Sequence, residues 1–217
     1  MGTRAAAFRT LLAAAVPVGL VLSAAVVWQS TAAAFTASTD NVGNTWQTGS
    51  VVLTDSDGGS ALFDSTRDRA LQPGSSRSRC IRVDYTGSLP ADIRLYVTTP
   101  SAGATTLDPY LVTSVERGQD VTASTTVAAD CSAGFTSTAT PTFLYNTASA
   151  SNAAADQGLT MSTLKSSAVD YTSGLVVGNA IPQNTSLTFR ITYSVKDDNN
   201  AQNTQSRATF TWEAQNG

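Results

Sequence analysis

The clearest pattern in the chain is a strict alternation in residues 187–195, Leu-Thr-Phe-Arg-Ile-Thr-Tyr-Ser-Val. Large apolar side chains occupy every second position, and polar side chains lie between them. Successive side chains of a β-strand point to opposite faces, so this spacing predicts a strand with one buried face and one wet face. After the turn residues 197–200 (Asp-Asp-Asn-Asn), residues 208–214 alternate in the same way and predict a second strand.

Shorter segments towards the amino end repeat this alternation. Residues 81–85 and 93–97 each place three apolar side chains two positions apart, and the turn residues Gly-Ser-Leu-Pro at 87–90 separate them. Many short strands joined by turns are typical of an all-β sandwich or barrel and not of a fold in which helices alternate with strands. Weaker strands are predicted at 51–53, 61–63, 111–115 and 143–145.

The composition excludes several classes of function. The chain has 217 residues, a net charge of −3 and no histidine, so it has no Ser-His-Asp triad, no Cys-His pair and no HExxH zinc site. Only 13% of the residues are charged and lysine occurs twice, which argues against nucleic acid as a partner. With 32 threonines and 25 serines, the chain suits a β-rich extracellular protein. We predict no catalytic site, no metal and no cofactor.

Residues 1–34 are organised like a secretory signal peptide. Arg4 and Arg9 form a short basic start, and residues 11–28 then carry no charge. The alanines at 32–34 supply the small residues that a signal peptidase recognises. We therefore predict export, with a location outside the cell or at its surface.

Cleavage is expected after Ala34, with Ala32 as the alternative site, so that Phe35 begins the mature chain. The protein would then meet the membrane only through its signal peptide, before cleavage. An uncleaved anchor stays open as an alternative, because the uncharged run would span roughly 27 Å as a helix, close to the ~30 Å of bilayer hydrocarbon.

Two cysteines remain after export, Cys80 and Cys131. An even number of cysteines in an exported chain indicates a disulfide. Such a bond would close a loop of about 50 residues and stabilise the fold by roughly 4 kcal/mol through the entropy of the unfolded chain. Two buried free thiols are the alternative.

Other residues suggest chemistry only weakly. The segment 55–59, Asp-Ser-Asp-Gly-Gly, is similar to the start of a calcium loop, but its ligand series is incomplete, so a turn is favoured. Glu116 and Glu213 would form a glycosidase pair only if they faced each other, and both lie at positions expected to be wet, so we predict surface charge. Trp212 lies on the apolar side of its strand, which predicts a core position and not a sugar-stacking one.

Several segments match the pattern of one known family. They are Ala-Ala-Phe-Thr-Ala at 33–37, residues 44–50, Gln-Pro-Gly-Ser at 72–75, residues 85–96, and Phe-Thr-Trp-Glu-Ala at 210–214. The Gly-Ser-Leu-Pro-Ala-Asp part of the fourth segment is the most specific. On these residues the chain resembles the TasA/camelysin family of secreted Gram-positive proteins, whose signal peptides are often processed by a SipW-type peptidase. The bias to arginine over lysine and the richness in alanine indicate a distant, actinobacterial-like member.

The resemblance implies an all-β, jelly-roll-like antiparallel β-sandwich over residues 50–217, preceded by a signal-peptide helix at 1–34. It also implies that the extended segment 35–49 adds as a strand to the next subunit of an extracellular fibre. Phe35, Val42 and Trp46 would then fill pockets on that subunit. The alternatives are a flexible lead-in or the first strand of the chain's own sandwich.

We therefore expect a non-catalytic structural protein of the cell surface or biofilm matrix, whose partner is itself or another matrix or surface protein. A monomeric binding module or adhesin is the second expectation. The metalloendopeptidase activity that the camelysin relatives imply is the weakest, because the chain has no histidine to hold zinc.

Overall fold

The structure is a computed structural model that describes residues 36–40, 53–58, 60–63, 68, 71–99, 106–146 and 159–216, with the backbone alone at 36–40. The chain divides into the units Met1–Ala34 and Phe35–Gly217. The predicted signal-peptide helix and its cleavage residues Ala32 and Ala34 lie outside the described residues. None of the helices in the described part of the chain is long and apolar enough to cross a membrane.

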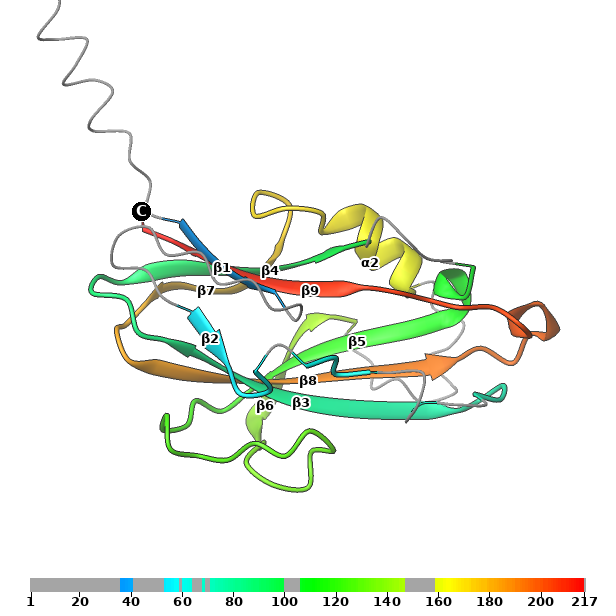
Figure 1. Cartoon of the computed structure of the whole chain (residues 1–217), viewed down its shortest axis with the longest axis horizontal. Coiled ribbons are helices and arrows are strands. Elements are labelled where there is room, and N and C mark those ends of the chain that lie inside the picture. The colour runs from blue at the N-terminus through cyan, green and yellow to red at the C-terminus, as the bar shows by residue number, and fades with distance from the viewer. Residues whose placement is uncertain are drawn as a thin grey trace, which may run out of the picture. The chain divides into compact units, whose positions relative to one another are not determined.

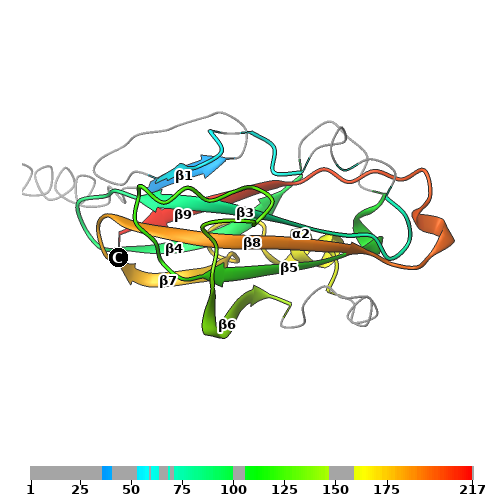
Figure 2. The same ribbon diagram turned by 90° about the horizontal axis from the view of Figure 1, so that it is seen from below.

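Two antiparallel sheets lie face to face in the second unit (Figures 1 and 2). The four-stranded sheet has the order β1-β9-β4-β7, with bounds Thr36–Asp40, Thr209–Gln215, Ala91–Thr98 and Leu175–Ile181. The five-stranded sheet has the order β2-β3-β8-β5-β6, with bounds Leu53–Asp55, Ser76–Tyr85, Thr185–Val195, Leu111–Gly118 and Ser137–Tyr145.

The order of the strands is that of a jelly roll. Strands β1, β4, β7 and β9 form one sheet, and β3, β5, β6 and β8 form the other, so the chain passes repeatedly between the two layers. The three-residue β2 is an addition at the edge of the second sheet. The structure therefore confirms the predicted all-β, jelly-roll-like antiparallel sandwich.

The core lies between the sheets and is built by the alternation seen in the sequence. Leu187, Phe189 and Ile191 of β8 are at most 1% exposed. The Phe189 ring packs against the indole of Trp212 on β9, with 5.2 Å between the ring centroids. Burying each large side chain stabilises the fold by about 1.5–3 kcal/mol. The predicted core position of Trp212 is confirmed.

The turn between β3 and β4 explains the most specific segment of the sequence. Tyr85, at the end of β3, is fully buried, and its hydroxyl donates a hydrogen bond to the carbonyl of Leu89. A Cβ atom at Gly87 would lie 2.2 Å from that hydroxyl oxygen. Glycine is therefore required at 87, because any side chain there would displace the tyrosine that fixes the turn.

Three segments differ from the sequence expectations. The strand predicted at 61–63 was wrong, since these residues form a bend. Strand β7 was not predicted, because Gly178 and Ala180 interrupt its apolar pattern. The helix α2 (Met161–Ser167) was also missed, since a seven-residue run rich in serine has little helical pattern. Its first turn is capped by the Thr160 side chain, and buried Leu164 anchors it to the core.

Candidate functional site

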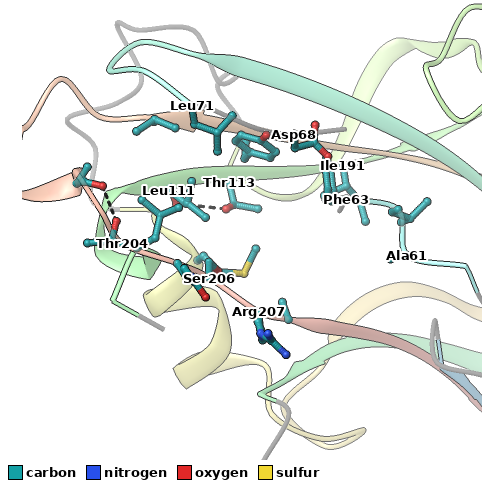
Figure 3. A pocket seen from close by; sticks show the side chains of 18 of the residues that line it. Ala61, Phe63, Asp68, Leu71, Leu111, Thr113, Ile191, Thr204, Ser206 and Arg207 are labelled. Carbon is teal, nitrogen blue, oxygen red and sulfur yellow. Dashed lines mark hydrogen bonds between the residues drawn. The ribbon is translucent and has the colours of Figure 1, made fainter. Parts of the chain in front are cut away.

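A pocket of about 990 Å³ opens at the end of the sandwich where β8 finishes and β5 and β9 begin (Figure 3). Its inner walls are apolar side chains from both sheets and from α2, and its rim is mostly polar. The apolar lining comprises Leu62, Phe63, Leu71, Leu107, Leu111, Met161, Ile191, Val195 and Phe210. Concave, mostly apolar spaces of this size with a few polar groups are the usual form of a small-molecule site.

Tyr193 of β8 is a buried polar residue of this pocket, as are Thr113 and Thr209. Tyr193 is 6% exposed, and Phe63 meets its ring edge-on at a centroid distance of 5.2 Å. Its hydroxyl oxygen is shielded from solvent and lies beside the Asp68 carboxylate. Burial, followed by the negative charge of Asp68, raises the pKa of Tyr193 to about 12. The phenol is therefore protonated at neutral pH.

An ion pair between Arg79 and Asp68 lies beside Tyr193. Arg79 of β3 donates to the Asp68 carboxylate at 3.1 Å, and both side chains are at most 14% exposed. The guanidinium of Arg79 also lies over the Phe63 ring, 5.7 Å from its centroid. These contacts hold Phe63 and Asp68 in the lining of the pocket, where Figure 3 shows both side chains.

A second buried ion pair fixes the opposite wall of the pocket. Lys165 of α2 donates to Asp108 at 2.7 Å and to the carbonyl of Arg207 at 2.6 Å. The Ser206 hydroxyl donates to the same carboxylate, and the Leu107 amide donates to the Gln205 carbonyl at 2.9 Å. Asp108 begins the short 3-10 helix η1 (Asp108–Tyr110). Residues 205–207, which these contacts hold, follow a second 3-10 helix, η3 (Asn199–Ala201).

A disulfide joins Cys80 and Cys131, with 5.0 Å between their Cα atoms, as the sequence predicted. It fastens residues 119–136, which we name the disulfide loop, to the five-stranded sheet. The Cys80 amide donates to the Ala129 carbonyl at 3.0 Å, and the Val121 amide donates to the Ser186 carbonyl at 2.9 Å. The loop thus covers the edge of β3 that the short strand β2 leaves uncovered.

The prediction that Glu116 is a surface charge was wrong. The residue is only 1% exposed, because the disulfide loop covers this face of the sheet. Arg190, directly opposite on β8, donates to the Glu116 carboxylate from Nε at 3.0 Å. The ring of Phe135, in the disulfide loop, lies 4.9 Å from the Arg190 guanidinium.

The same prediction was wrong for Glu213, which is 8% exposed. The Tyr96 hydroxyl donates to its carboxylate at 3.0 Å. Glu213 lies on β9 and Glu116 on β5, so the two carboxylates belong to different sheets and do not form a facing pair.

No group of three or more potential metal ligands occurs within the described residues, and this includes the turn at 55–58.

The edge of the four-stranded sheet is formed by β1, which pairs with β9 through five consecutive residues from Thr36 opposite Gln215 to Asp40 opposite Thr211. Segment 35–49 thus includes a strand of the chain's own sandwich. Phe35, Val42 and Trp46 lie outside the described residues.

These features define a class of protein: a jelly-roll sandwich with an apolar pocket at one end, a disulfide-fastened loop on one sheet and a short amino-terminal strand at the edge of the other. No family model matches the chain, and no curated protein or solved structure matches it either. The resemblance to the TasA/camelysin family therefore stays a prediction.

Proposed function

We propose that this chain is a secreted, non-catalytic structural protein of the cell surface or biofilm matrix, and that it polymerises by exchanging β1 between subunits. The pairing of β1 with β9 is the observation that carries this proposal. Thr36, the first residue of the strand, lies two positions after Ala34, where we predict cleavage.

Exchange of β1 between two copies of the chain would preserve the main-chain hydrogen bonds of the sheet edge. A strand from a neighbouring copy can make the same main-chain hydrogen bonds to β9 that the chain's own strand makes, because sequence and register are identical. Main-chain bonds at a sheet edge supply affinity without a specialised side-chain surface. An edge of five residues, from Thr211 to Gln215, is the acceptor.

The proposal also gives cleavage of the predicted signal peptide a function in polymerisation. Before cleavage, β1 is preceded by 35 residues, of which the first 34 form the predicted signal peptide. Cleavage would release the strand's amino end and allow it to pass to a neighbour. The partner is then a second copy of this chain, outside the cell, and fibres are the expected product.

A cysteine pair tests the exchange directly. Ala37 lies opposite Ala214, and adjacent strands bring such Cα atoms to about 4.5–5.5 Å, within the range that a disulfide spans. In Ala37→Cys/Ala214→Cys, a bond formed within one chain runs as a monomer on a non-reducing gel. A bond formed across exchanged strands gives a ladder of covalent multimers.

We expect the ladder after cleavage, together with fibres in negative-stain micrographs. Thr36→Cys/Gln215→Cys provides the other pair geometry, since hydrogen-bonded and non-bonded pairs alternate along the ladder. The single variant Ala37→Cys controls for random cross-linking. If both double variants give only monomer bands and elute as monomers, β1 is not exchanged and the monomeric surface module is the better assignment.

A further inference from the structure

We infer that the turn between β3 and β4, residues 86–90, contacts the surface of a lipid bilayer while the sandwich is still joined to residues 1–34. The side chain of Leu89 is the contact group, and the partner is a zwitterionic lipid surface. This contact adds to the one predicted for the signal peptide itself. The inference rests on the predicted signal peptide and not on the exchange of β1.

The turn lies at the end of the sandwich where the chain enters it (Figures 1 and 2). Gln215 of β9 pairs with Thr36, the first residue of β1, and with Asp92, the second residue of β4. The start of β1 is therefore level with the end of the turn. Residues 29–35 connect Thr36 to the uncharged segment 11–28 and extend over at most about 25 Å. A bilayer that holds the uncharged segment is thus close to this end of the sandwich.

The apolar side chains at this end are open to solvent. Leu89 is 53% exposed, the highest value for a large apolar side chain in the described part of the chain. Pro90 and Pro182 are also exposed, and they lie next to each other because Ala91 pairs with Ile181 at the end of the ladder between β4 and β7. Exposed apolar side chains of this kind gain free energy when they enter the boundary between lipid headgroups and acyl chains.

Charge does not oppose this contact. No charged residue occurs in 85–91 or in 171–189, the segments that contain the two turns at this end. Asp84 is paired with Arg82 at 2.8 Å, and the Asp92 carboxylate accepts a backbone amide hydrogen bond at 2.8 Å. The whole chain has a net charge of −3, so a zwitterionic surface is favoured over an anionic one.

The backbone of the turn already has hydrogen-bond partners within the protein. The Leu89 carbonyl accepts a bond from the Tyr85 hydroxyl. The Ser88 carbonyl accepts one from the side-chain amide of Gln183. Carbonyl groups that are bonded internally lose less free energy when they leave water than unbonded ones. Both bonds also fix the turn, so little conformational entropy is lost on contact.

Spin labels measure the contact in the full chain, held in phosphatidylcholine nanodiscs and purified through a tag on the disc protein. The two native cysteines are joined in a disulfide, so only an introduced cysteine is labelled. Ser88→Cys places a label on the turn and keeps Leu89. Power saturation compares the accessibility of the label to oxygen, which concentrates in lipid, with its accessibility to a nickel chelate, which stays in water.

Val169 provides the matched control position. Its side chain is 46% exposed, similar to that of Leu89. The preceding residue, Ala168, accepts a hydrogen bond from the Val97 amide at 2.8 Å. Val97 is six residues along β4 from Ala91, a distance of about 20 Å. A label on Val169→Cys therefore reports on a part of the sandwich far from the turn.

The oxygen-to-nickel ratio of the label at 88 should be severalfold higher in nanodiscs than in the cleaved chain 35–217 in buffer. The ratio at 169 should be equal in the two samples. Leu89→Asp should return the ratio at 88 to its value in buffer, whereas Val169→Asp should leave it unchanged. Both substitutions alter exposed side chains, so the fold is retained.

Equal ratios at 88 in nanodiscs and in buffer, or a full chain that does not stay on the discs, would overturn the inference. Low accessibility to both reagents would also overturn it, because a protein surface and not lipid would then cover the turn. A ratio that stays high in Leu89→Asp would overturn the assignment of Leu89. Exchange of β1 is tested on the cleaved chain, so the two results are independent.

Discussion

Removal of the Cys80–Cys131 disulfide by the double substitution Cys80→Ala/Cys131→Ala should destabilise the protein without changing its fold. The cysteines are 51 residues apart, and a crosslink that closes a loop of this length restricts the unfolded chain by about 4 kcal/mol in the chain-entropy model. The folded state keeps the hydrogen bonds of the disulfide loop, including those to Ala129 and from Val121. The substitution therefore acts mainly on the unfolded state, whose conformational entropy rises when the crosslink is removed.

Urea unfolding followed by the fluorescence of buried Trp212 measures this loss. With a slope of about 2 kcal/mol per molar urea, the midpoint should fall by about 2 M. Wild-type protein in reductant should lose the same amount, and the double variant should not respond to reductant. A loss below about 1 kcal/mol, or a variant that reductant destabilises further, would refute the reasoning.

Three further predictions concern packing and titration. Gly118→Ala should destabilise by about 1–3 kcal/mol in the same urea assay, because a Cβ atom there would lie 2.8 Å from the Thr136 carbonyl oxygen; an unchanged midpoint would contradict the tight seating of the disulfide loop. Trp212→Ala should cost about 3–5 kcal/mol through the cavity that it leaves, measured by urea unfolding followed by circular dichroism because the variant lacks the indole, and a loss below about 1 kcal/mol would place the indole outside the core. The pKa of Tyr193 rises from 10.0 to about 12 on folding, so the unfolded chain loses its proton first, and stability should fall as the pH rises through that window. Unfolding measured from pH 9 to pH 12 should show a smaller fall in Tyr193→Phe, and identical profiles would contradict the burial of the hydroxyl.

The strands with strict alternation could be predicted from the sequence. β8 and β9 place their large apolar side chains on one face, so a period of two was enough to find the strands and to assign Phe189 and Trp212 to the core. The disulfide also followed from the number of cysteines and the predicted export. These features depend on residues that are close in sequence or on the redox conditions of the compartment.

The burial of Glu116 and the pocket could not be predicted in this way. Alternation placed Glu116 on the face away from the core, which is correct, but a loop that begins three residues later folds back over that face. The pocket collects residues from β5, β8, β9 and α2, so no segment carries its signature. Both features depend on contacts between segments far apart in the chain.

The position of β9 has a consequence for how the protein folds. This strand is the last of the described strands, yet it lies between β1 and β4 and pairs with both. Neither neighbour gains this partner until residues 209–215 are available to fold. Closure of the sheet must then join segments separated by almost the whole sequence, a topology that is typical of slow folding. The folding chain should therefore pass through a stage in which the edges of β1 and β4 that β9 later joins are both open.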